Sequence, residues 1–311
     1  MGIDGIIVTN IYKGCYPLLS FGISATYLMI KIIGIIVVFG SVLAGFVLSG
    51  GKIASIIQPF EVLIIGGAAM GAFLQANSSS TFMQVLKKSL AMFSSRFTKA
   101  LYLDVLKMLY EVLNKSRREG MMAIEADIED PASSPIFSNY PAILKDERMT
   151  EFVCDYLRIM TTGNMAPHEF EGLFDMELTS LKEDLDHPSH AVTSIADGLP
   201  GFGIVAAVLG IVVTMAMLGE AEQAALGQHV GAALVGTFLG ILAAYGFFGP
   251  LATSLAHDAK EELNLYEAIK ATLVASASGM PPSLAVEFGR KVLFGGHRPT
   301  FAELEQAVRG G

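Results

Sequence analysis

The chain has 311 residues, of which 52% are hydrophobic and 16% charged, and its formal net charge is −9. This acidic balance argues against nucleic acid as a partner. The two cysteines, Cys15 and Cys154, are too few for a disulfide framework, and no Cys/His cluster with ligand spacing indicates a metal or another cofactor.

The N-terminal part is interpreted as an extension, residues 1–28, followed by two transmembrane helices within residues 29–77. The extension lacks the basic start and the cleavage site of a signal peptide, so Met29 is an alternative start of the chain. The uncharged apolar segments 32–51 and 62–76 predict the two helices. About 20 apolar residues cross the bilayer core at a rise of ~1.5 Å per residue, and the second segment is short by this measure.

Residues 78–199 are predicted to form a folded helical domain. Apolar residues recur there with helical spacing in two stripes, and charged residues lie on the opposite side of each stripe. A further helix is expected to begin at Pro167. The stripes comprise Leu101, Val105, Met108, Leu109, Val112 and Leu113, and Phe152, Val153, Tyr156, Leu157 and Met160.

Two more transmembrane helices are predicted within residues 200–256, and a helical tail follows at 257–311. The apolar segments 199–219 and 230–256 contain no Asp, Glu, Lys or Arg and are long enough to span a bilayer. Patterns typical of strands are negligible. The predicted fold class is therefore an all-α integral membrane protein with four transmembrane helices, a large helical loop and a helical tail.

The distribution of Lys and Arg predicts the orientation. These residues are concentrated in the loop 78–199 and in the tail, whereas the two short connections between helices hold only Lys52. Cytoplasmic segments carry an excess of Lys and Arg close to the membrane, and Lys87 and Lys88 follow the second helix. We therefore expect a chain that crosses the membrane several times, with the loop and both termini in the cytoplasm.

Small residues lie along one face of three of the predicted membrane helices. Such faces let helix backbones approach closely in lipid, and plain packing is the commoner explanation for them. A contribution to function is the alternative. The faces comprise Gly67 and Gly71 in the second helix, Gly203, Ala207, Gly210 and Thr214 in the third, and Gly236, Gly240 and Ala244 in the fourth.

Two prolines indicate possible hinges. Pro200 lies at the start of the third apolar segment, where simple helix initiation is the structural explanation. Pro250 lies inside the fourth segment, where a proline frees a backbone carbonyl and kinks the helix. For both residues a kink that serves only packing remains the alternative to a functional hinge.

None of the four apolar segments contains Asp, Glu, Lys, Arg or His. Proton paths through membranes normally use such groups. If the chain conducts protons, a partner must therefore supply the carrier carboxylate. The hydroxyls of Thr214, Thr237, Tyr245 and Thr253 are candidates for a relay, or they are hydrogen-bonded back to their own helix.

Several long strings, taken in order, resemble the flagellar stator proteins of the MotA type, within the wider family that includes TolQ and ExbB. The similarity covers nearly all of the chain after residue 28. The strings are MIKIIGIIVVFGSVLAGF from Met29, QPFEVLIIGGA from Gln58, KSRREGMMAIEADIEDP from Lys115, LPGFGIVAAVLG from Leu199, VGTFLGILAAYGF from Val235 and PPSLAVEFGRKVLF from Pro281.

The resemblance implies a stator subunit that couples proton flow to torque on the flagellar rotor. About five such chains would surround the helices of a MotB-like partner, which would bring the proton-carrying Asp. The cytoplasmic loop would act on the rotor protein FliG. By matching to the family motifs, Arg117, Glu125 and Glu177 would face the rotor, although exposed charges are more often a solvated helix face.

The same matching assigns residues of the proton path. Pro200 and Pro250 match the two prolines of the family, and Thr237 is a hydroxyl that the family keeps. Sodium-driven relatives carry hydroxyls where this chain has Ala207 and Gly236. Because these residues offer no oxygen ligand from a side chain, the resemblance favours protons over sodium.

Other classes of protein fit the sequence less well. A TolQ/ExbB-type energiser of an outer-membrane process would share the membrane helices, but Arg117, Glu125 and the tail motif AVEFGRK favour the stator. A transporter with its own substrate site would normally show intramembrane charge or an internal repeat. We expect no enzyme, because no nucleophile, acid and base occur together in one segment.

Overall fold

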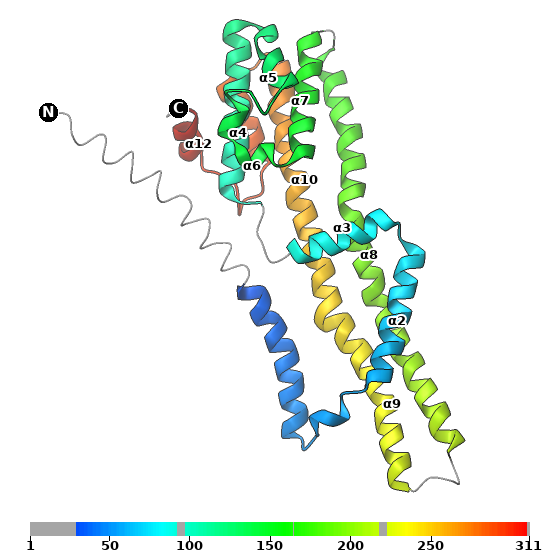
Figure 1. Cartoon of the computed structure of the whole chain (residues 1–311). Coiled ribbons are helices and arrows are strands. Elements are labelled where there is room, and N and C mark those ends of the chain that lie inside the picture. Colours follow the sequence, from blue (N-terminus) through cyan, green and yellow to red (C-terminus); the bar gives the residue numbers. More distant parts are fainter. Residues whose placement is uncertain (1–28, 92–96, 164, 218–222, 310–311) are drawn as a thin grey trace, which may run out of the picture. The chain divides into compact units, whose positions relative to one another are not determined.

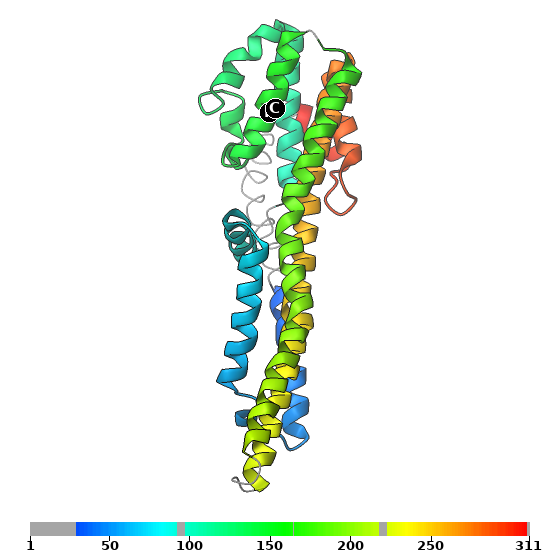
Figure 2. The same cartoon turned by 90° about the vertical axis from the view of Figure 1, so that its right-hand side faces the viewer.

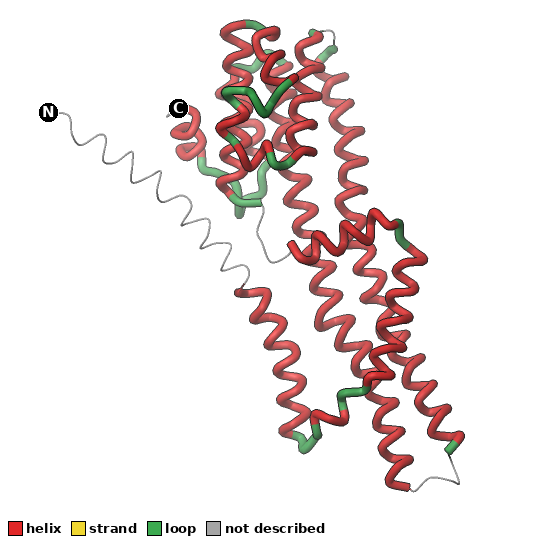
Figure 3. Tube along the Cα trace, in the orientation of Figure 1, coloured by secondary structure: helices red, strands yellow, loops and turns green. Residues whose placement is uncertain are grey.

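The computed structural model describes residues 29–91, 97–163, 165–217 and 223–309, so the extension at residues 1–28 lies outside the described part (Figure 1). Within these ranges every regular element is a helix and no strand occurs (Figure 3). The predicted all-α class is therefore confirmed. The chain divides into two compact units, Met1–Ser95 with Asp186–His257, and Arg96–Leu185 with Asp258–Gly311.

Four helical segments are long and apolar enough to cross a membrane. They are Met29–Leu48, Ile53–Ala76, Pro167–Ala216 and Leu226–Ala277. This confirms the prediction of four spans, and the chain is a multi-pass membrane protein. The second segment joins the 3-10 turn η1 (Ile53–Ser55) to the helix α2 (Pro59–Ala76), so this span begins earlier than its apolar run suggests.

The first unit contains the first two membrane-capable segments, α3 (Ser79–Ala91), and the parts of the other two segments that fall within Asp186–His257. In it α2 lies beside α8 (Pro167–Ala216) and α9 (Gln223–Ala243), as Figures 1 and 2 both show. Ile65, Ala69 and Phe73 repeat every four residues on the buried face of α2. This spacing places them on one side of the helix. Ile65 and Ala69 pack in one cluster with Leu199 and Ala206 of α8, whereas the ring of Phe73 contacts Phe82 of α3.

The helix α8 contradicts one interpretation of Pro200. It runs without a break for 50 residues, and both Pro188 and Pro200 lie inside it. Pro200 therefore does not initiate a helix. A proline inside a helix removes one backbone hydrogen bond, which membrane helices tolerate where neighbouring groups compensate for the loss.

A π-helical turn interrupts the fourth span directly before Pro250. The turn, η4, covers Ala244–Phe248 between α9 and α10 (Gly249–Ala277). Pro250 has no N–H to donate to the carbonyl of Gly246, four residues earlier. The wider i→i+5 pattern of a π-helix is a known way to accommodate such an irregularity, and it is frequent at functional sites.

The second unit has its own hydrophobic core. It contains the start of α8 up to Leu185 and the part of α10 from Asp258 onward. Its other elements are α4 (Lys99–Glu119), η2 (Met121–Ile124), α5 (Glu125–Glu129), η3 (Phe137–Asn139), α6 (Pro141–Leu144), α7 (Glu147–Thr162), α11 (Pro282–Val292) and α12 (Phe301–Arg309). Most residues of both predicted stripes are buried, including Val105 and Leu109 of α4 and Val153 and Leu157 of α7. The rings of Tyr156 and Phe174 stack at 3.5 Å between their centroids.

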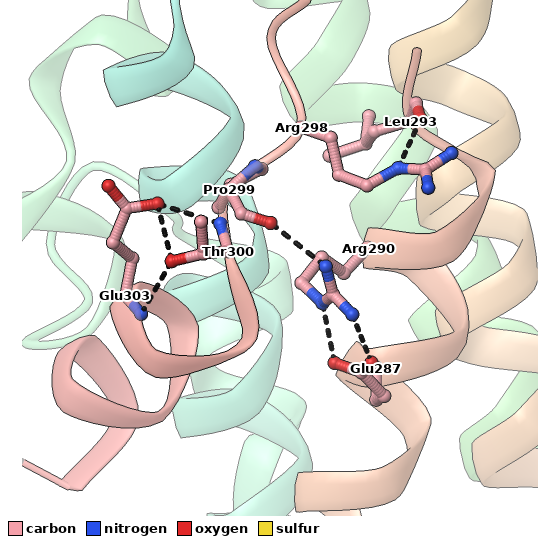
Figure 4. Close-up of polar contacts among 7 residues, drawn as sticks. All are labelled: Glu287, Arg290, Leu293, Arg298, Pro299, Thr300 and Glu303. Carbon is pink, nitrogen blue, oxygen red and sulfur yellow. Dashed lines mark hydrogen bonds and ion pairs between the residues drawn. The ribbon is translucent and has the colours of Figure 1, made fainter. Parts of the chain in front are cut away.

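Hydrogen bonds and ion pairs fix the path of the tail between α11 and α12 (Figure 4). The buried guanidinium of Arg290 donates to the carboxylate of Glu287 and to the Pro299 carbonyl. Glu303 accepts hydrogen bonds from the backbone N–H and the hydroxyl of Thr300, and Lys99 of α4 forms an ion pair with it at 2.7 Å. These bonds fix the start of α12 and tie it to α4.

Candidate functional site

The helices α8 and α9 approach each other closely in the membrane unit. A Cβ atom added to Gly203 would lie 2.8 Å from the carbonyl oxygen of Gly236, and one added to Gly240 would lie 2.6 Å from that of Leu199. Both neighbours are backbone atoms, which cannot move independently of their helices. The small-residue faces of the third and fourth spans therefore pack against each other, as the sequence indicates.

Three of the residues predicted for the proton path lie at or near this contact. Ala207 is buried and Pro200 half-buried on α8, in the same helical stretch as Gly203. Thr237 is half-buried on α9, and its Cα is 3.2 Å from the position of a Cβ on Gly203. The structure thus brings Pro200, Ala207 and Thr237 to one helix pair, although it does not test their role.

Pro250 belongs to a different part of the same unit. It lines a cavity of about 260 Å³ between the helix Met29–Leu48 and the η4–α10 junction. At this cavity Lys31 donates a hydrogen bond of 2.8 Å to the hydroxyl of Ser254. The π-helical turn and the proline therefore face a gap rather than a tightly packed neighbour.

Two of the candidate relay hydroxyls are bonded within their own helices. Thr214 donates to the carbonyl of Gly210 at 2.8 Å, and Thr253 donates to that of Gly249 at 3.1 Å. Such bonds from i to i−4 satisfy the hydroxyl without any ligand. For these two residues the hydroxyl is therefore hydrogen-bonded back to its own helix, which was the alternative to a relay.

The expectation that the spans contain no charged side chain is wrong. Glu61 lies in the first turn of α2, inside the second span, and only 8% of it is exposed. Its Oε2 atom has no hydrogen-bond partner among the described residues. Lys31 and His229 also lie inside candidate spans. The sequence argument treated charged residues as limits of the spans, whereas these residues lie inside the helices.

The carboxylate of Glu61 points at the α8–α9 contact. A Cβ on Gly236 would lie 2.6 Å from Oε2, and a Cβ on Gly210 would lie 3.5 Å from Oε1. Ala206, which is fully buried, adjoins the same space. Two glycines on different helices thus leave room for one carboxylate from a third helix.

The residues predicted to face the rotor lie in the second unit. Arg117 is exposed near the end of α4, and Glu125 is exposed at the start of α5. Glu177 is exposed on α8, where it accepts a hydrogen bond of 2.7 Å from the Tyr156 hydroxyl. Burial and this acceptor raise the pKa of Tyr156, so the phenol keeps its proton.

A buried polar cluster supports the segment that carries Arg117 and Glu125. The carboxylate of Asp127, 2% exposed, accepts a bond of 2.7 Å from Lys115 and one of 2.6 Å from the Ser134 hydroxyl. The Ser134 oxygen in turn accepts hydrogen bonds from the backbone N–H groups of Ile136 and Phe137. Sequence reasoning missed Asp127, although an acid twelve residues after a Lys in the matched string KSRREGMMAIEADIEDP was visible.

Known protein families match most of the chain. The model for the N-terminal domain of Motility protein A matches residues 32–120, and that for the MotA/TolQ/ExbB proton channel family matches residues 145–280. Motility protein A of Salmonella typhimurium is 43% identical over 90% of this chain and 95% of its own length. Chemotaxis protein LafT of Vibrio parahaemolyticus is 36% identical over 89% and 98%.

Solved structures share the fold. The C. jejuni MotAB structure superposes with a TM-score of 0.68 at 18% identity, over 85% of this chain and 95% of that one. The flagellar MotAB stator complex of Bacillus subtilis gives 0.64 at 23% identity, over 82% and 92%. The resemblance drawn from the sequence strings is therefore confirmed, and the chain belongs to the MotA family of motility proteins within the MotA/TolQ/ExbB proton channel family.

Proposed function

We propose that the chain is the stator subunit of a bacterial flagellar motor and couples proton flow to torque on the rotor. About five copies surround the membrane helices of two MotB-like single-span chains in the inner membrane, and these partner chains carry the proton on their Asp. The loop and both termini lie in the cytoplasm, where Arg117, Glu125 and Glu177 act on the rotor protein FliG. The observation that carries the proposal is the 43% identity over 95% of a motility protein.

The membrane unit supports a partner helix. Ile204, Val208 and Val212 recur every four residues on α8, and each is more than half exposed in the single chain. Their spacing forms a stripe distinct from the buried face with Ala206 and Gly210. An apolar face of this kind accepts another membrane helix by dispersion packing.

The choice of ion is argued from the side chains that α8 and α9 themselves bring to their contact, where the Glu61 carboxylate comes from α2. Ala207 and Gly236 have no side-chain oxygen, whereas Thr237 has one hydroxyl. A sodium ion needs several oxygen ligands to replace its water, so these residues favour protons. One charge crossing the membrane releases ~2.3 kcal/mol per 100 mV, which requires a coupled helix movement of low cost. Pro200 within α8 and Pro250 beside the π-helical turn are the proposed hinges.

The experiment uses a deletion strain that carries the gene on a plasmid. The strain without the gene should not swim, and swimming should return with the gene, persist without sodium and stop with a protonophore. Pro200→Ala and Pro250→Ala should leave the protein at normal levels in the membrane and slow rotation. The proposal would be contradicted if the strain without the gene swims, or if swimming of the strain with the gene depends on sodium.

A further inference from the structure

One end of the second unit has an open cavity that the proposed function does not yet use. Its volume is about 440 Å³, and its walls come from the last turn of α4, η2, the end of α7, the start of α8 and the junction of α10 with α11. Arg117 is one of the lining residues. The cavity therefore adjoins the segment proposed to face the rotor.

Three chain reversals at this end depend on glycine. Gly120, Gly163 and Gly279 have φ angles of +94°, +67° and +85°, a region that other residues rarely adopt. A Cβ on any of them would meet nothing within 4 Å. The glycines are thus needed for the turns, and the space beside them is open.

Methionines dominate the apolar lining. Met121, Met160, Met165 and Met280 come from four different segments, and Met165 and Met280 remain about 40% exposed. Methionine side chains are flexible and polarisable, and they are over-used on surfaces that adapt to a partner. Exposed apolar side chains gathered around a cavity, rather than scattered singly, mark an interaction site.

The charge of the cavity is positive. Arg117 is the single charged residue that lines it, and Arg117 and Arg118 form no ion pair or hydrogen bond in the described part of the chain. Lys115, two residues before Arg117, differs because it forms an ion pair with Asp127. A free guanidinium beside an apolar cavity selects an occupant with a carboxylate next to an apolar side chain.

We infer that this cavity binds an apolar side chain that a partner protein carries beside a carboxylate on a helix. The apolar side chain enters among the methionines, and the carboxylate pairs with Arg117. The inference rests on the proposed function, because it describes what the rotor-facing surface recognises. It adds an apolar anchor to a surface otherwise described by charge alone.

The test combines cross-linking with a charge substitution. A benzophenone amino acid replaces Met165 in the full chain, in cells that swim, and the cross-linked peptide is identified by mass spectrometry. Met280→Glu is then added, since it places a carboxylate in the wall of the cavity that Arg117 also lines. Met176→Glu, on an exposed position of α8 outside the cavity, is the matched control.

The inference requires one partner peptide with an apolar residue within a helical turn of Asp or Glu. Met280→Glu should lower the cross-link yield about tenfold, the loss typical of a contact residue that dominates an interface. Met176→Glu should match the parent chain. A peptide from a second copy of this chain, a peptide without a carboxylate, no cross-link, or equal yields for the two variants would overturn the inference.

Two controls separate this inference from the proposed function. Unreacted Cys154 under native conditions shows that each variant keeps its fold, because this thiol is buried in the core of the same unit. If the strain without the gene still swims, the stator proposal is refuted. The cross-link yield is measured independently of swimming, so it tests only the cavity. If the Met280→Glu chain does not fold, Met165→Glu takes its place and the cross-linking amino acid is moved to position 280. The cross-link yield should then fall by the same factor.

Discussion

Gly240→Ala tests the close approach of α8 and α9 most directly. The new methyl group would lie 2.6 Å from the Leu199 carbonyl oxygen and 3.0 Å from the Gly203 Cα. Normal contacts between such atoms lie near 3.5 Å or beyond, so the helices must separate by roughly 1 Å. Overpacking of this kind costs about 1–3 kcal/mol. Gly231→Ala in the same helix is the control, because nothing lies within 4 Å of its Cβ.

Both substitutions raise helix propensity equally, by about 1 kcal/mol, so this effect cancels in the comparison. The measurement is the free energy of unfolding of the purified protein, titrated from mild detergent into sodium dodecyl sulfate and followed by circular dichroism. Gly240→Ala should be less stable than Gly231→Ala by about 1–3 kcal/mol. Stabilities equal within about 0.5 kcal/mol would refute the close contact.

Three further predictions use other parts of the chain. Gly236→Ala should destabilise the membrane unit because its methyl group would lie 2.6 Å from Glu61 Oε2. The loss of stability should be smaller in a Glu61→Ala background, and a double-mutant cycle measures the difference. Burial raises the pKa of the Cys154 thiol to about 12, so in a Cys15→Ser chain iodoacetamide at pH 8 should label Cys154 only after unfolding; rapid native labelling would contradict this. Hydrogen bonds from Lys99 and Thr300 lower the pKa of Glu303 from 4.5 to about 2, so the docking of α12 should be intact above pH 4.5 and weaken as the pH falls toward 2; hydrogen exchange of α12 that is unchanged across this range would argue against it.

Regular spacing made much of this fold predictable. The membrane helices were visible as uncharged apolar runs long enough to span a bilayer. The stripes of α4 and α7 repeat with the helical period, because one side of each of these two helices is buried. The glycines of α8 and α9 were also visible as faces. Periodicity identifies a buried face, but it does not say which neighbour covers that face.

The features that sequence reasoning missed depend on neighbours far along the chain. Pro200 fits a helix start equally well by local rules, and only the continuation of α8 on both sides decides the matter. The π-helical turn before Pro250 and the Met-lined cavity have no periodic signal. The cavity arises where five segments meet at three glycine turns, so it required the tertiary structure.

Glu61 and Gly236 form one feature rather than two. The Oε2 atom of Glu61 occupies the space that any side chain at position 236 would enter, and Gly210 leaves room for the other carboxylate oxygen. A larger residue at position 236 alone would clash with the Glu61 carboxylate. A smaller residue at position 61 alone would leave a void at the α8–α9 contact. The oxygen nearest Gly236 in this chain therefore comes from a third helix, and the polarity of the contact depends on α2 as much as on α8 and α9.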